Sequence, residues 1–207
     1  MTSTPPPTQP VSSPRADARR AQVRSAAAEC FREYGFHGTS IAQISKRAGM
    51  STGHIYHYFE NKEAIIADIV AEDVQRLVQM TTELRRARDV KAAMVERAVD
   101  GVENNLDPGA AGLQLEIVAE AARNANIAAI WQAADRQCRE SLATTLRTHR
   151  QSAGHQNNEA AIAGMVEAIA AMFEGLRIRA IRTAEIDRDA VVQVFRRMLG
   201  DLLGQPG

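Results

Sequence analysis

The segment from residue 39 to residue 62 constrains the fold of this chain more than any other part of the sequence. Apolar residues recur every three or four positions up to Ala48, Gly49 interrupts the pattern, and Ile55 and Phe59 resume it. This spacing is typical of helices, and a glycine permits a sharp turn between two of them. The segment therefore predicts a helix-turn-helix, a motif that reads DNA.

Helical spacing of apolar residues continues through the rest of the chain. No segment alternates between apolar and polar residues like a strand, so we predict an all-α fold. Caps of the helix-turn-helix are expected at Thr39 or Ser40, at Ser51 and at Asn61. The other helices are expected at about residues 16–34, 61–86, 89–104, 110–123, 126–151, 158–182 and 187–203, after a flexible tail over residues 1–14.

The 207 residues are electrically balanced but unevenly charged. Residues 15–62 carry eight Lys or Arg against four Asp or Glu, and since the chain has 25 of each, the remainder carries 17 against 21. A basic front end suits contact with phosphates. No apolar run approaches the roughly 20 residues of a membrane helix. Cys30 and Cys138 lack partners at metal-ligand or redox-motif spacing, so we expect a reduced cytoplasmic protein without cofactor or metal.

A helix that reads DNA enters the major groove with its first turn, which therefore needs small or polar side chains. Thr52, Gly53 and His54 meet that need, although Gly53 could also be a tolerated glycine near a helix start. Hydrogen-bonding aromatic groups and the starts of neighbouring helices can hold the sugar-phosphate backbone. The arginines of residues 15–20 either add to this contact or are solvated. The full candidate set is Thr39, Ser40, Thr52, Gly53, His54, Tyr56, His57, Tyr58 and Lys62.

A longer ordered pattern surrounds these candidates. It comprises Phe31, Gly35 and the segments GTSIAQIS at residues 38–45, AGMS at 48–51, IYHYF at 55–59 and NKE at 61–63. Over about residues 20–66 the chain thereby resembles the TetR-family repressor signature. The region from Leu115 to Trp131 is more loosely similar to the effector domain of the BetI-like branch.

The resemblance implies a domain organisation and a mode of action. It places a three-helix DNA-binding domain at residues 15–62 and a larger helical domain at residues 63–207, which dimerises through its last two helices and encloses an effector pocket. The same nine candidate residues match the DNA-contacting positions of the family. We expect a regulator, in the simplest case a repressor, that binds a palindromic operator as a homodimer and is released by a small, largely apolar effector. Activation remains an alternative, and the sequence identifies neither effector nor operator nor regulated genes.

Two apolar stripes near the C-terminus are wider than a helix with a single neighbour requires. Two such helices from each protomer can form a four-helix interface, although an internal core contact is the alternative. The candidate interface residues are Ile162, Val166, Ile169, Phe173, Leu176, Val191, Phe195, Met198 and Leu202. Candidate walls of an apolar effector pocket, each of which could equally be plain core, are Met94, Ile117, Trp131, Cys138, Met165 and Phe173.

Two other classes of function fit the sequence less well. His54, His57 and Glu60 have a spacing that could suggest a metal site, but all three have a place in the DNA-reading helix. No catalytic constellation or nucleotide-binding loop is recognisable, so we do not expect an enzyme. A helical adaptor that binds another protein is the main alternative, and it leaves the basic, aromatic front end unexplained.

Overall fold

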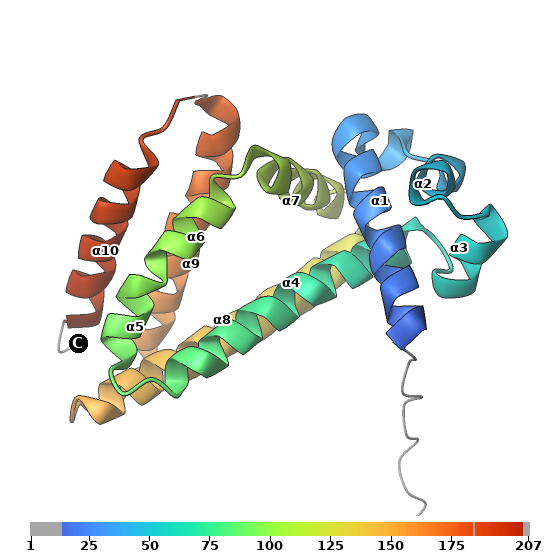
Figure 1. The fold of residues 1–207 in the computed structure, drawn as a ribbon. Helices are drawn as coiled ribbons and strands as arrows, with labels where there is room; N and C mark the ends of the chain where they lie inside the picture. The colour runs from blue at the N-terminus through green and yellow to red at the C-terminus, as the bar shows by residue number, and fades with distance from the viewer. Residues whose placement is uncertain (1–13, 184, 205–207) are drawn as a thin grey trace, which may run out of the picture.

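The computed structural model describes residues 14–183 and 185–204, and this part of the chain folds into ten α-helices without a strand (Figure 1). The all-α prediction is confirmed. The predicted tail lies outside the described residues except for Pro14, which begins the first helix. The helices are α1 Pro14–Gly38, α2 Ile41–Ala48, α3 Thr52–Tyr58, α4 Lys62–Arg85, α5 Val90–Glu96, α6 Ala98–Asn105, α7 Pro108–Ala121, α8 Ala125–Ser152, α9 Glu159–Arg182 and α10 Arg188–Gly204.

Side-chain caps define the starts of α2, α3 and α4. Ser40 forms a capping box with Gln43. The Ser40 hydroxyl accepts the backbone N–H of Gln43, and the backbone N–H of Ser40 donates to the Gln43 side chain at 2.7 Å. Ser51 and Asn61 cap α3 and α4 as predicted. Gly49 ends α2 with a φ of 62°, a left-handed conformation that glycine adopts without steric cost. Ser40, and not Thr39, is therefore the cap of α2.

Several helix boundaries differ from the prediction, among them the end of α1, which lies at Gly38 rather than at residue 34. The single helix expected for residues 89–104 is two helices that meet at Arg97, whose ψ of −7° departs from the roughly −42° of an α-helix. α7 begins at Pro108, two residues before the predicted start at residue 110. Asp107 accepts the N–H of Ala110 at 2.6 Å as a cap, and proline suits the first helical turn because its missing N–H is not needed there.

The long helices α4 and α8 run side by side in the same direction along the molecule. Figure 1 shows α1, α2 and α3 at one end of this pair, α5, α6, α9 and α10 toward the other end, and α7 between the two groups. α7 packs against α1, α8 and α9, while α10 packs against α5 and α6. α1 packs against α2, α4 and α7 and therefore connects the helix-turn-helix to the larger helical body.

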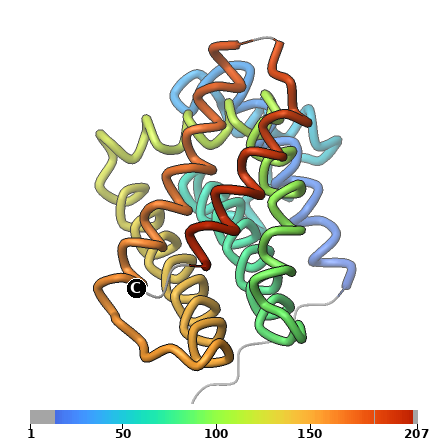
Figure 2. The backbone as a smooth tube through the Cα atoms, turned by 90° about the vertical axis from the view of Figure 1, so that its left-hand side faces the viewer, coloured from blue at the N-terminus to red at the C-terminus, as the bar shows by residue number. Residues whose placement is uncertain are grey.

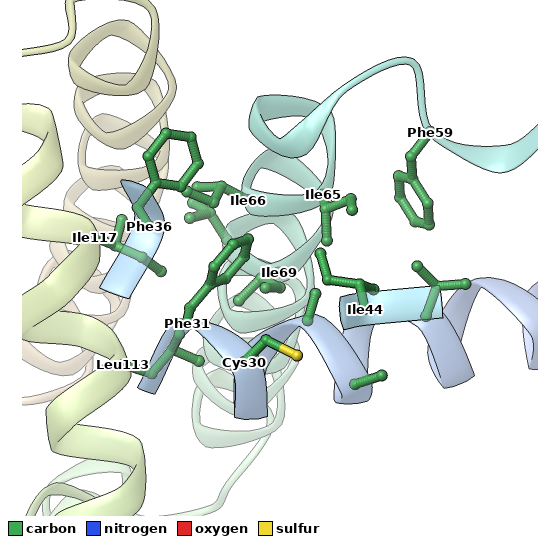
Figure 3. Close-up of a cluster of buried hydrophobic side chains, with 14 of the residues drawn as sticks. Cys30, Phe31, Phe36, Ile44, Phe59, Ile65, Ile66, Ile69, Leu113 and Ile117 are labelled. Carbon is green, nitrogen blue, oxygen red and sulfur yellow. The ribbon is translucent and has the colours of Figure 1, made fainter. Parts of the chain in front are cut away.

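The core beneath the helix-turn-helix extends into the rest of the molecule. Figure 3 shows Phe31 and Phe36 of α1 in one cluster with Ile66 of α4 and with Leu113 and Ile117 of α7. Two further clusters lie among α4, α5, α6, α8, α9 and α10. Since the first cluster includes α7 and α8, the DNA-reading helices and the larger helical body share buried side chains.

Gly101 of α6 is packed directly beneath an aromatic ring. A Cβ at this position would lie 2.5 Å from Cε1 of Phe173, a distance that forces the ring or the helix to move. We expect Gly101→Ala to lower the free energy of unfolding by about 1–3 kcal/mol, the usual effect of overpacking, although alanine favours a helix. Urea unfolding measures this effect. Gly112→Ala in α7, where no described atom lies within 4 Å of a Cβ, is the matched control; equal stability of the two variants would contradict the prediction.

Candidate nucleic-acid interface

The short helix α3 is held by apolar residues and exposes polar ones. Ile55 on its inner face and Phe59 directly after it are both buried in the first core cluster, as predicted. The opposite side of the helix is open to solvent, which is the arrangement that a reading helix needs. The exposed residues are Thr52, Gly53, His54, Tyr56 and His57.

Tyr58 orders the two histidines of this surface. Its ring centroid lies 5.3 Å from that of His54 and 5.0 Å from that of His57, the latter in an edge-to-face arrangement. Tyr58 itself is half-buried. Aromatic contacts of this kind favour particular side-chain positions, so both imidazoles are held at the surface with nitrogens that can donate or accept hydrogen bonds.

Gly53 has no internal reason to be glycine. No described atom lies within 4 Å of a Cβ built at this position, and its φ lies outside the left-handed region. Neither close packing nor backbone strain within the chain therefore excludes a larger residue. The absence of a side chain leaves the backbone of the first turn of α3 accessible to an outside surface.

Two of the candidate DNA contacts point into the protein instead. Thr39 is 2% exposed, and its hydroxyl lies 2.8 Å from the carbonyl oxygen of Gly35 and 3.0 Å from that of Cys30. The expectation that the Thr39 side chain faces DNA is wrong, because it is buried in the turn. The Lys62 ammonium donates to the carbonyl oxygens of Phe36 at 2.6 Å and Thr39 at 2.7 Å, and burial lowers the pKa of Lys62. Lys62 therefore fastens the turn between α1 and α2 to the start of α4.

Arg20 and Gln22 are structural residues that sequence reasoning missed. The Arg20 guanidinium donates to the carbonyl oxygen of Tyr58 at 3.2 Å and pairs with Asp68 at 2.5 Å, so it is bound within the protein although its side chain is 37% exposed. Gln22 donates to the carbonyl oxygen of Ala48 at 2.7 Å. Together they attach the ends of α2 and α3 to α1, and thus fix the angle at which α3 is presented.

The positive charge of the front end is partly neutralised within the structure. Arg47 pairs with Glu33 and lies 3.8 Å from Glu29. Hydrogen bonds from Tyr34 and from Arg47 hold the pKa of Glu33 below its usual range. Lys46, one residue earlier in α2, is exposed. The charge available to an outside anion is therefore smaller than the sequence count suggests.

A metal site at His54, His57 and Glu60 finds no support in the geometry. Within residues 14–183 and 185–204, no group of three or more His, Cys, Asp or Glu side chains is arranged to hold a metal ion. The rings of both histidines contact that of Tyr58, as described above. None of the helices in the same ranges is long and apolar enough to span a membrane.

The six candidate pocket residues do not surround one cavity. They are distributed over the three hydrophobic clusters of the core. Ile117, Trp131 and Cys138 belong to the first cluster, Met94 and Met165 to the second, and Phe173 to both the second and the third. The prediction of a common cavity is therefore not supported by the structure. A hollow of about 410 Å³ opens elsewhere, among α4, α5, α6 and α10, with Glu83, Arg97 and Arg196 in its lining.

The candidate dimer residues also lie mostly inside the protomer. Met198 is 46% exposed, whereas the other eight are buried or half-buried and pack within the core of the protomer. A different apolar surface faces outward on α9 and α10, the two helices turned toward the viewer in Figure 2. We call it the outer stripe; it consists of Gly164, Ala168, Ala171, Gly175 and Ile178 on α9 and Val194 and Met198 on α10, all of which are exposed.

A helix-turn-helix with an exposed polar α3, attached to a larger helical body, defines a class of DNA-binding regulators. Residues 23–69 match the family of bacterial regulatory proteins called the tetR family, and residues 87–204 match the C-terminal domain of BetI-type transcriptional repressors. The chain belongs to the TetR family and is a DNA-binding transcriptional regulator. Both resemblances predicted from the sequence are thereby confirmed.

Similar proteins are transcriptional regulators as well, in agreement with the expectation that the chain is not an enzyme. The regulator UidR of Escherichia coli K12 is 32% identical over 136 residues, which cover 66% of this chain and 68% of UidR. The repressor AcnR of Corynebacterium jeikeium is 24% identical over 76% of this chain and 79% of its own length. The structure of GusR from Salmonella enterica superimposes with a TM-score of 0.74 at 26% identity, over 95% of this chain and all of GusR.

Proposed function

We propose that the protein is a repressor that binds a palindromic operator as a homodimer, with α3 of each protomer in successive major grooves. The exposed polar surface of α3, held on a buried apolar face and open at Gly53, is the observation that supports this most strongly. AcnR, one of the similar proteins, is itself named a repressor. In this proposal residues 15–62 bind DNA and residues 63–207 regulate and dimerise. A protein with chromosomal DNA as its target is expected to act in the cytoplasm.

The exposed candidates divide into two proposed roles. Thr52 and His54 lie in the first turn of α3 and read base edges, with the backbone at Gly53 in close approach. Ser40, Tyr56 and His57 hold the sugar-phosphate backbone on either side, as hydroxyl and imidazole groups commonly do. Tyr58 positions the histidines, while the side chains of Thr39 and Lys62 stabilise the turn between α1 and α2 from within the protein.

His57 and Thr52 distinguish these two roles. We expect His57→Ala to weaken binding to all duplexes by a similar factor, and Thr52→Ala to change the preference at particular base pairs by about 1–3 kcal/mol. Fluorescence anisotropy with the duplex that the wild-type protein selects from a randomised pool, and with its single-base variants, measures both effects. His155→Ala, an exposed histidine far from α3 in the sequence, is the control. Unchanged affinities in both test variants would reject this assignment of contacts.

The outer stripe is proposed as the dimer surface. Small residues on α9 let two helices approach closely, and Ile178, Val194 and Met198 provide large apolar side chains. The exposed fractions of these three residues and of Ile181, also on α9, are 46–54%. Scattered apolar residues are normal on a protein surface, but a row of exposed small and apolar residues at helical spacing on α9, with Val194 and Met198 exposed on α10, fits a second copy of the same surface. The dimer must place its two reading helices about 34–36 Å apart to enter successive grooves.

We further propose that a small, largely apolar effector releases the operator by binding within the helical body. Two solved proteins with this fold support a small-molecule role: FadR of Bacillus subtilis is described in complex with stearoyl-CoA, at 20% identity and a TM-score of 0.71, over 86% of this chain and 96% of FadR. A regulator of Saccharomonospora viridis is described in complex with choline, at 21% identity and a TM-score of 0.64, over 89% of this chain and 95% of its own. An effector must bind the two conformations with different affinity, and here it must separate packed helices or use the hollow beside Arg196.

A further inference from the structure

Two carboxylates of α7 grip the turn between α1 and α2. The Phe36 N–H donates to Oε1 of Glu116 at 2.6 Å, and Nε2 of His37 lies 3.0 Å from Oε2 of Glu120. Glu116 and Glu120 are one helical turn apart and therefore face the same neighbour. Phe36 and Glu116 are separated by 80 residues, so this contact joins the DNA-binding helices to the helical body.

Gly35 gives the turn the shape that the contact requires. It interrupts α1 with a φ of 70° and a ψ of 170°, a conformation open to glycine and strained for other residues. The break directs the next backbone N–H, that of Phe36, to a side chain rather than to the helix. A Cβ at Gly35 would lie 3.1 Å from Oε1 of Glu116, so the carboxylate is seated against a glycine.

The same turn leads directly to the DNA-facing surface. Lys62 donates to the carbonyl oxygens of Phe36 and Thr39, and the Thr39 hydroxyl bonds back to Gly35. Ser40, which follows at once, caps α2. The two α7 carboxylates therefore contact the segment that leads directly into α2.

Glu120 is satisfied as a buried charge and tied to the start of α8. It is 1% exposed and also accepts hydrogen bonds from Arg123 at 3.2 Å and Asn124 at 3.3 Å. Removal of a buried acceptor with several donors is costly because each donor loses its partner. Asn124 in turn donates to Glu63 at the start of α4 at 2.8 Å. One network thus connects the end of α7 with the turn and with α4.

α4 itself is fastened along α8 by buried polar contacts. Thr81 and Ser141 share a hydrogen bond of 2.6 Å between their hydroxyls, and Arg85 donates to the Ser141 carbonyl oxygen at 3.1 Å and to Thr145 at 3.2 Å. These two helices are therefore expected to move as one body. α7 packs against α8 and α9 as well as against α1, and it contacts α1 through the apolar side chains of Leu113 and Ile117 in addition to its two carboxylates.

We propose that Glu116 and Glu120 are positioning residues for DNA binding: through them α7 holds the α1–α2 turn, so that a displacement of α7 in the helical body changes the placement of α2 and α3. The inference rests on the proposed function and adds to it a route for regulation through α7. It requires no contact between either carboxylate and DNA.

Operator affinity of the full-length protein tests the proposal, with the duplex that the wild type selects from a randomised pool as the probe. We expect Glu116→Ala and Glu120→Ala each to weaken binding about 10-fold, within the usual range of coupling between sites. Glu116→Gln keeps an oxygen that accepts the Phe36 N–H and should bind within about 2-fold of the wild type. Glu103→Ala, an exposed glutamate of α6, is the matched control and should bind as the wild type does.

Hydrogen exchange separates positioning from a general loss of structure. In Glu116→Ala, amides of residues 35–40 should exchange faster while those of α8 keep their protection, and Glu116→Gln should restore the slow exchange. Wild-type affinity in both alanine variants overturns the inference and leaves the proposed function standing. Equal loss in Glu116→Gln and Glu116→Ala, or loss of protection throughout the chain, also overturns it. A wild-type protein that selects no duplex overturns the proposed function and this inference together.

Discussion

Gly53→Ala will leave the protein folded and remove most of its operator binding. The added methyl group meets no described atom within 4 Å, and alanine is favoured over glycine in a helix by about 1 kcal/mol. The free energy of unfolding should therefore stay the same or rise. A methyl group in the first turn of α3 would, in contrast, separate the helix from the floor of the major groove. Operator affinity should fall at least about 10-fold, which corresponds to 1.4 kcal/mol.

Urea unfolding and gel-shift titration of the same preparation measure the two sides of this prediction. Gly112→Ala, also in a helix and without neighbours at its Cβ, should gain stability without a change in affinity. If Gly53→Ala binds the operator like the wild type, the backbone of α3 does not approach the DNA and Gly53 is merely a tolerated glycine.

Ile178→Asp is expected to separate the dimer and thereby to abolish tight operator binding. Ile178 is 48% exposed in the protomer and lies on the outer stripe, so an aspartate there is exposed in the monomer but buried in the proposed dimer. Burial of an unpaired carboxylate costs several kcal/mol. Once separated, each protomer binds one half-site alone and loses the roughly 10²–10⁴-fold gain that linked sites provide.

Sedimentation velocity measures the oligomeric state, and the same samples serve for gel shifts. Val118→Asp in α7 is the control, because Val118 is an apolar residue of similar exposure, 43%, outside the stripe. Its dimer should persist. A dimeric Ile178→Asp protein with intact affinity would place the interface on another surface.

Local features of the fold could be predicted from the sequence because they depend on neighbouring residues. The caps at Ser51 and Asn61 and the turn at Gly49 follow from short-range hydrogen bonding and backbone freedom. The buried positions of Ile55 and Phe59 follow from helical spacing. These features define the DNA-reading helix, which explains why the exposed face of α3 agrees with the prediction.

The sequence could not show which apolar face of α9 is covered. Ile162, Val166 and Ile169 give the stronger hydrophobic signal, and they fill the core of the protomer. The outward face is formed by glycine and alanine, which scarcely register as apolar. The outer stripe, which we propose as the dimer surface, is therefore not predicted when the interface is assigned to the largest apolar side chains. The positions of Thr39 and Lys62 depend in a similar way on a turn geometry that residue type alone does not reveal.

Contacts between distant segments were not predicted from the sequence, although one of them has a pattern that the sequence does carry. Nothing in residue type indicates that Glu116 accepts a backbone N–H of α1. The pairing of α1 with α4, however, has a readable pattern: Arg20 and Arg24 are four residues apart, as are their partners Asp68 and Glu72. Matching charge spacing on two predicted helices identifies such a contact before coordinates exist.

Hydroxyl-radical footprinting of the selected duplex tests most directly whether a dimer reads an operator with two copies of α3. The structure leads us to expect two protected patches on one face of the DNA, centred about one helical turn apart, with both patches lost in Gly53→Ala at the same protein concentration. A duplex that stays unprotected at low salt, or a single patch that is unaffected by Gly53→Ala, would contradict the proposed mode of binding.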